Sequence, residues 1–210
     1  MKYIAEFFGT FTLALAVLLS LAFNAPVATP LLAALTLGLF VYTTGHISGT
    51  HINPAVTVGI FTLGKIKPVE AVGYIVAQML GGVAAYLLAF NVLGLAPLGP
   101  LGASMTIFVA EAIGMALFTF GIAAAVYGRV PAGFSGVVVG GSLLLGIALA
   151  VGAGSGGVLN PAVALALGSF NVAYLGGQLV GSIVGFQLYR MISGGEAEPA
   201  KKEAAPAKKK

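Results

Sequence analysis

The chain has 210 residues, of which 59% are hydrophobic and only 8% are charged. Its mean hydropathy of +1.04 excludes an ordinary soluble domain, because so much apolar surface needs lipid around it. The net charge of +4 does not indicate nucleic acid, since half of the basic residues lie in a short tail after residue 200. The chain has no cysteine, which excludes disulfide and thiol chemistry.

Six apolar stretches approach the roughly 20 residues that a membrane-spanning helix needs. In chain order they are residues 3–23, 31–45, 69–92, 105–127, 134–151 and 172–192. The first could instead be a signal peptide with Lys2 as its positive region, but Glu6 interrupts it and five comparable stretches follow. We therefore predict an all-α membrane protein with six transmembrane helices in a lipid bilayer.

Basic residues fall on one side of these predicted spans. Lys2 precedes the first span, Lys65 and Lys67 follow the second, Arg129 follows the fourth and Arg190 ends the sixth. The connections 24–30, 93–104 and 167–171 carry no charge. Because Lys and Arg are retained in the cytoplasm, both termini are predicted to be cytoplasmic, in a multi-pass protein of the cell (plasma) membrane.

The tail, residues 194–210, is rich in Ala, Lys, Glu and Pro and is predicted to be disordered. A solvated topology anchor with weak attraction to anionic lipid is the favoured interpretation, and a site for a specific partner is the alternative. The membrane domain is therefore predicted to comprise residues 1–193.

The two halves of the chain repeat. Glu6 lies 105 residues before Glu111, and the triplet that begins at Asn53 lies 107 residues before the one that begins at Asn160. Each half, about 3–93 and 105–192, holds three predicted spans. Since three is odd, the second half must be inverted in the membrane relative to the first, and a functional site is expected near the midplane.

Two further apolar segments, 51–63 and 158–169, are too short to span a membrane. Each contains Asn followed by Pro, and Asn is a favoured N-cap while Pro suits the first helical position. We predict two re-entrant half-helices that meet at their amino ends. Their dipoles and the amide donors of the two Asn would make the meeting point hostile to cations and able to donate hydrogen bonds.

Small residues spaced four apart let transmembrane helices approach closely. One such seam lies in the third span, and an equivalent one lies in the sixth. We predict that they join the two halves. Their members are Gly73, Ala77, Gly81 and Ala85, and Gly177, Gly181 and Gly185.

Residues 46–57, with the sequence HISGTHINPAVT, and the two Asn-Pro-Ala triplets carry a resemblance to a known family. Over about residues 3–192 the chain resembles the aquaporins, or major intrinsic proteins. The resemblance implies an hourglass of six tilted helices and two half-helices, with one pore in each subunit of a homotetramer. It implies passage of water and small uncharged solutes, with no cofactor, no metal and no catalytic residue.

The resemblance also implies roles for individual residues. The triplets Asn53-Pro54-Ala55 and Asn160-Pro161-Ala162 would form the pore centre, where the two Asn orient each passing molecule. Glu6 and Glu111 would brace the half-helix loops, with a proton relay as the alternative. His46 and His51 would brace a loop or line the pore mouth, and metal ligation is disfavoured with two His and no Cys.

The departure from the family pattern follows the second triplet. Aquaporins usually have Arg there, but this chain has Val163, and Ala164 stands where glycerol facilitators have Asp. Counting without gaps, the other selectivity-filter positions fall on Ala33, Ala148 and Gly157. These four residues predict a wide, apolar filter that passes water with larger neutral solutes, such as glycerol, urea, hydrogen peroxide or ammonia. The half-helix dipoles and the two Asn are expected to keep protons excluded.

Two other functions stay open at this stage. An ion-coupled secondary transporter can also use inverted repeats and broken helices, although it usually needs titratable groups at the midplane. A non-conducting scaffold of aquaporin-like fold is the second alternative. No set of nucleophile, base and acid indicates an enzyme.

Overall fold

The computed structural model describes residues 1–23, 26–96, 99 and 101–195, and the regular structure in them is helical. Most of the predicted tail, from residue 196 onward, lies outside the described residues. In chain order the elements are α1 (Lys2–Ala22), α2 (Thr29–Ser48), α3 (Pro54–Thr62), α4 (Pro68–Leu87), the π-helical turn η1 (Leu88–Val92), α5 (Met105–Val126), the 3-10 turn η2 (Ala132–Phe134), α6 (Ser135–Gly152), α7 (Pro161–Ala166) and α8 (Val172–Ser193).

Each predicted span corresponds to a helix. Five helices in the described part of the chain are long and apolar enough to cross a membrane, namely α1, α2, α4 with η1, α5 and α6. The sixth, α8, has 22 residues but is less apolar, because its buried face carries small and polar residues such as Gly177, Gln178 and Ser182. These residues pack inside the protein, so they place no polar surface in lipid.

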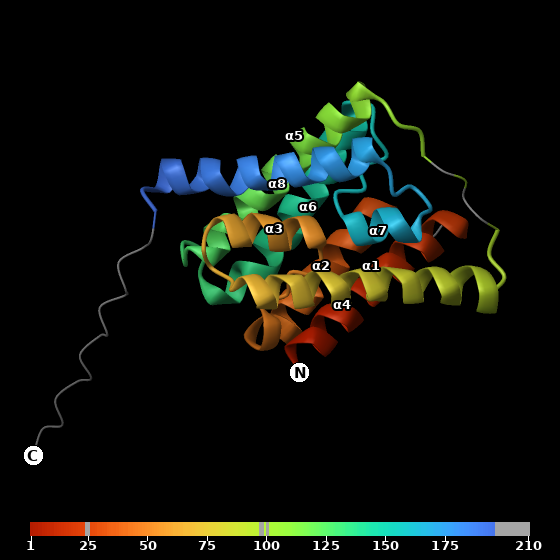
Figure 1. Ribbon diagram of the computed structural model, residues 1–210, viewed down its shortest axis with the longest axis horizontal. Helices are drawn as coiled ribbons and strands as arrows, with labels where there is room; N and C mark the ends of the chain where they lie inside the picture. Colours follow the sequence, from red (N-terminus) through yellow and green to blue (C-terminus); the bar gives the residue numbers. More distant parts are fainter. Residues whose placement is uncertain (24–25, 97–98, 100, 196–210) are drawn as a thin grey trace, which may run out of the picture.

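The short helices α3 and α7 lie in line between α4 and α8 (Figure 1). Their amino ends meet in the middle of the molecule, and each half-helix contacts long helices of both repeats. The halves also meet directly where α2 packs against α6. This is the predicted inverted-repeat arrangement, with two half-helices enclosed by six long helices.

The glycine seams do not join the two halves, and that prediction is wrong. A Cβ on Gly81 of α4 would lie 2.6 Å from the carbonyl oxygen of Phe7 in α1. A Cβ on Gly181 of α8 would lie 2.3 Å from the carbonyl oxygen of Ala112 in α5. Each seam therefore brings two helices of the same repeat into backbone contact. The prediction failed because the spacing of small residues shows where a helix can be approached closely but does not identify the helix that approaches it.

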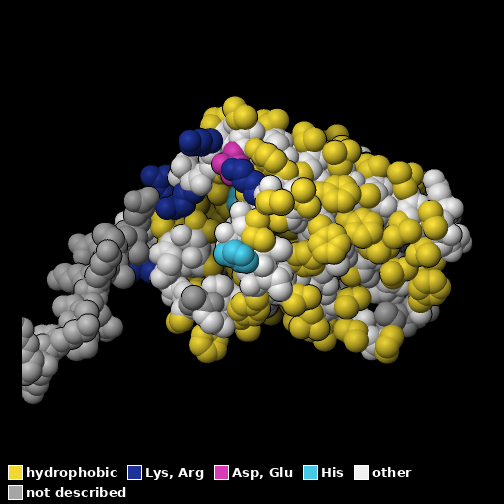
Figure 2. Space-filling model, turned by 90° about the horizontal axis from the view of Figure 1, so that it is seen from below, with side chains coloured by type: hydrophobic (Ala, Val, Ile, Leu, Met, Phe, Trp, Pro, Cys, Tyr) yellow, Lys and Arg dark blue, Asp and Glu magenta, His cyan; other side chains and the backbone are white. Residues whose placement is uncertain are grey.

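Charged side chains gather at one end of the molecule (Figure 2). Lys2 and Glu70 form an ion pair there, with Nζ and Oε1 2.5 Å apart. We call this end, which holds the start of α1 and the last turn of α8, the terminal end, and the other the opposite end. The side of the molecule between them is covered by exposed apolar side chains such as Leu35, Leu39 and Val72, as a lipid-facing surface requires.

Candidate functional site

Two asparagines begin the half-helices, as predicted. The Asn53 side-chain oxygen accepts hydrogen bonds from the backbone N–H groups of Ala55 and Val56, at 2.9 and 3.4 Å. The Asn160 oxygen accepts equivalent bonds from Ala162 and Val163, at 3.0 and 3.5 Å. Each side chain thus satisfies backbone donors that the start of a helix would otherwise leave unpaired.

The amide nitrogens of the same asparagines join the two repeats. Nδ2 of Asn53 donates to the carbonyl oxygen of Leu159 at 2.8 Å, and Nδ2 of Asn160 donates to that of Ile52 at 3.0 Å. Each amide has two N–H donors, so one stays available to a molecule in the cavity that both side chains line. Only 3% of either residue is exposed, which holds these donors at a fixed place inside the protein.

Glu6 holds the loop before α3. Its carboxylate accepts backbone N–H bonds from His51 at 3.0 Å and Ile52 at 2.6 Å. It also accepts from the Ser48 hydroxyl at 2.6 Å and the Gln78 amide at 2.7 Å. The backbone of Ile52 has φ +37°, a left-handed conformation that a β-branched residue rarely adopts, so these bonds stabilise a strained turn.

Glu111 holds the second loop in the same manner. Its carboxylate accepts N–H bonds from Val158 at 2.9 Å and Leu159 at 2.8 Å, where Leu159 has φ +49°. The Gln178 amide donates to it at 2.8 Å, and the Ser155 hydroxyl also donates to it. The bracing contacts that the resemblance implies for Glu6 and Glu111 are therefore present on both sides of the midplane.

The two loops differ in the polar contacts of the glutamine beside each glutamate. The Thr57 hydroxyl accepts a hydrogen bond from Gln78 Nε2 at 2.9 Å and lies 3.1 Å from His51 Nδ1. Ala164 occupies the position of Thr57 in the second repeat. Gln178 is fully buried, and its side-chain oxygen has no hydrogen-bond partner among the described residues.

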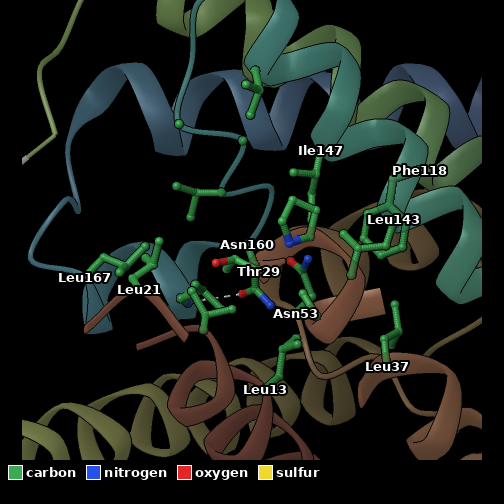
Figure 3. A pocket seen from close by; sticks show the side chains of 18 of the residues that line it. Leu13, Leu21, Thr29, Leu37, Asn53, Phe118, Leu143, Ile147, Asn160 and Leu167 are labelled. Atoms are coloured by element: carbon green, nitrogen blue, oxygen red, sulfur yellow. Dashed lines mark hydrogen bonds between the residues drawn. The ribbon is translucent and has the colours of Figure 1, made fainter. Parts of the chain in front are cut away.

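A cavity of about 500 Å³ contains both asparagines. In Figure 3, Leu21 and Leu167 lie on one side of the asparagines, and Leu37, Phe118 and Leu143 lie on the other. The walls are mainly apolar side chains from both repeats. The lining residues are Leu13, Val17, Leu21, Thr29, Pro30, Ala33, Leu37, His51, Ile52, Asn53, Gly99, Leu101, Phe118, Leu143, Ile147, Val151, Gly156, Gly157, Val158, Asn160, Val163 and Leu167.

A second cavity, of about 470 Å³, continues toward the terminal end. It shares Leu37 and His51 with the first cavity, so the two adjoin at these residues. His46 is exposed and lines this second cavity. His51 is buried and lines a third cavity as well, of about 310 Å³, so its ring stands where all three spaces meet.

Three of the four predicted filter residues line the first cavity: Ala33, Gly157 and Val163. Ala148 does not, because its side chain lies on the exposed face of α6, and this assignment is corrected. The residue of α6 that faces the cavity at this level is Ile147. A Cβ on Gly157 would lie 3.0 Å from Ile147 Cγ2, so the isoleucine narrows the passage beside Gly157 more than an alanine would.

Sequence reasoning missed Ile147 and its neighbours Leu143 and Val151, which line the cavity at a spacing of four. That spacing is the only sequence signal that could have indicated these cavity-lining residues, and it is weak in a helix that is apolar on every side. Among the described residues no group of three or more His, Cys, Asp or Glu could hold a metal ion. The lining of the cavity consists of mainly apolar wall and the side chains of the two asparagines, which suits passage of an uncharged solute.

Comparison with known proteins gives consistent matches. A family model described as "Major intrinsic protein" matches residues 1–105. Aquaporin Z of Photorhabdus laumondii is 32% identical, over 91% of this chain and 96% of the relative. Probable aquaporin AqpM of Archaeoglobus fulgidus is 34% identical, over 76% of this chain and 74% of the relative. The aquaglyceroporin structure from Plasmodium falciparum shares the fold, with a TM-score of 0.67, 21% identity and coverage of 91% and 93% of the two chains.

Proposed function

Because the chain belongs to the major intrinsic protein family, we propose that it is a passive membrane channel through which water and small uncharged solutes move down their gradients. The observation that carries this proposal is the adjoining pair of cavities, with Asn53 and Asn160 in the first. A solute would cross from one end of the bundle to the other between the two repeats. Glycerol, urea, hydrogen peroxide and ammonia are the candidate solutes besides water.

The electrostatics and the apolar walls at the centre of this path account for the exclusion of ions and protons. The amino ends of α3 and α7 direct partial positive charge at Asn53 and Asn160, which disfavours a cation. An apolar wall gives an ion nothing to replace its hydration shell. We assign Glu6 and Glu111 the role of bracing the loops that present these asparagines, because their oxygens are occupied by loop and side-chain donors.

The placement in the membrane is proposed from charge. The terminal end carries Lys2 and the other basic residues of the described chain, so this end is assigned to the cytoplasm and the opposite end to the outside of the cell. The plasma membrane is the proposed location. A homotetramer with one pore in each subunit is the proposed assembly, and the basic tail would anchor its cytoplasmic face.

Flux measurements on reconstituted protein test the channel. Proteoliposomes are exposed in a stopped-flow instrument to gradients of water, glycerol, urea or ammonia, with protein-free vesicles as the baseline. A channel predicts flux that rises linearly with concentration and does not depend on an ion gradient. Saturating, ion-dependent flux would instead support a secondary transporter, and flux equal to the baseline for every solute would support a scaffold.

Proton exclusion needs a separate measurement. A pH-sensitive dye trapped in the same vesicles should report no more proton leakage than in protein-free vesicles. Leakage well above that baseline would contradict the role given to the two asparagines and the helix dipoles.

A further inference from the structure

The carboxyl ends of α3, α5 and α8 come together at the terminal end of the molecule. Gln187 of α8 donates to the Thr62 hydroxyl and carbonyl oxygens at the end of α3, each at 3.1 Å. The Tyr127 ring, which directly follows α5, stacks on the Tyr189 ring of α8 with the ring centroids 5.8 Å apart. These contacts hold the three helix ends beside one another.

Basic residues lie next to this pair of tyrosines. Lys65 Nζ lies 4.9 Å from the centre of the Tyr127 ring, within the range of a cation–π contact. Arg129 follows Tyr127 by two residues, Arg190 follows Tyr189 directly, and both arginines are exposed. We call Lys65, Arg129 and Arg190 the basic cluster. They come from three segments that are far apart in the sequence, so tertiary packing gathers the positive charge seen at this end in Figure 2.

Acidic side chains do not accompany the two arginines. Among the described residues Glu70 is the one acid that is not fully buried, and it forms an ion pair with Lys2. Neither Arg129 nor Arg190 forms an ion pair within the described part of the chain. The carboxyl ends of α5 and α8 each carry roughly half a negative elementary charge, which offsets about half of the charge of the arginines that follow them. An excess of positive charge therefore remains at this surface.

Exposed apolar side chains of α8 adjoin the basic cluster on the side of the membrane interior. They are Ile183, Val184 and Leu188, which precede Arg190 along the helix and lie deeper than it by about 3–10 Å at 1.5 Å per residue. A free phosphate ion gains nothing from such a surface, whereas an acyl chain covers it. Positive charge above exposed hydrocarbon therefore fits a phospholipid better than a soluble anion.

We propose that the basic cluster binds an anionic phospholipid, with the lipid phosphate held by Arg129 and Arg190 and an acyl chain lying along α8. Each guanidinium can bind two phosphate oxygens through parallel N–H donors, and Lys65 adds a third positive charge. Retention of this end in the cytoplasm requires positive charge, but it does not require three basic residues beside one pair of tyrosines. The site is separate from the proposed pore, because none of the three residues lines the first cavity.

Native mass spectrometry of the full chain in mild detergent tests this site, with phosphatidylglycerol as the anionic probe and phosphatidylcholine as the control lipid. Wild type should retain phosphatidylglycerol more strongly. A basic residue near anionic lipid contributes about fivefold in affinity, so Arg129→Gln with Arg190→Gln should weaken phosphatidylglycerol binding by about tenfold or more. Lys209→Gln with Lys210→Gln is the matched control, because it removes the same charge from the tail, and it should change the affinity by less than about twofold.

Two further results are expected. Arg129→Lys with Arg190→Lys keeps both charges and should retain most of the affinity. Added phosphatidylglycerol should raise the melting temperature of wild type but not that of the Arg129→Gln, Arg190→Gln variant.

Equal weakening in the two glutamine variants would overturn the proposal, because general attraction between charges would then explain the binding. Equal retention of the two lipids by wild type would also overturn it. Displacement of phosphatidylglycerol by millimolar inorganic phosphate would show a site for a soluble anion and not for a lipid. None of these measurements depends on solute flux, so the proposed channel function is tested separately.

Discussion

The unpaired oxygen of Gln178 predicts that a hydroxyl at position 164 stabilises the protein. In the first repeat the Thr57 hydroxyl lies 3.3 Å from the Gln78 side-chain oxygen and can donate to it. In the second repeat Ala164 has no hydroxyl, and the Gln178 oxygen is buried without a partner in the described part of the chain. Val158 stands where the first repeat has the larger His51 imidazole. We therefore expect Ala164→Thr to supply the missing donor.

The size of the effect follows from the cost of the unpaired group. Leaving a buried acceptor unsatisfied costs about 1–3 kcal/mol, and some of that gain is lost to closer packing around the added atoms. A net gain of roughly 1 kcal/mol corresponds to a rise of about 2–4 °C in melting temperature for a chain of this size. The assay is thermal unfolding in mild detergent, followed by the loss of the soluble, monodisperse peak.

Ala164→Val is the matched control, because valine has nearly the shape of threonine without the hydroxyl. It should leave the melting temperature unchanged or lower it. Equal melting temperatures for the threonine and valine variants, or a lower one for threonine, would refute the reasoning that the Gln178 oxygen lacks a partner.

Three more substitutions test the bracing of the first loop and the lining of the pore. Glu6→Gln keeps the size of the side chain but replaces one acceptor oxygen with an amide group, which then faces buried donors. We therefore expect the free energy of unfolding to fall by roughly 2 kcal/mol or more, and solute flux to fall with it. Unchanged thermal unfolding would contradict the bracing role of Glu6. Ile147→Trp should block solute flux because it fills the cavity beside Gly157, whereas Ala148→Trp, one residue further along the outer face of α6, should leave flux near wild type. Block by the Ala148 variant alone would show that the position of α6 in the structure is wrong.

The parts of the site that follow local rules could be predicted from the sequence. Asn before Pro gives a helix cap, and both asparagines do cap half-helices. The repeat paired Glu6 with Glu111, and the resemblance supplied the bracing contacts that both carboxylates make. These predictions succeed because a short motif determines its own backbone geometry, whatever helix packs beside it.

The rest depends on tertiary packing. An ungapped count placed Ala148 in the pore, but α6 is apolar on its lipid face and on its pore face, so no pattern distinguishes Ala148 from Ile147. The glycine seams marked close approaches but not the partner helices. Leu101 lies in an irregular connection with no periodicity, and its bonds to Ser169 and Asn171 hold it beside the first cavity.

The exchange Val163→Arg tests the central claim, that solutes cross through the apolar cavity beside Asn160. Val163 lines this cavity and is only 3% exposed, so an arginine there would fill the passage and add a positive charge. The measurement is urea and glycerol flux into proteoliposomes with wild type, the variant or no protein. Wild type should pass both solutes faster than protein-free vesicles, and the variant should reduce this flux by about tenfold or more, equivalent to about 1.4 kcal/mol in the barrier. Equal flux through wild type and a folded Val163→Arg variant would contradict the account, because the solutes would then not pass Val163.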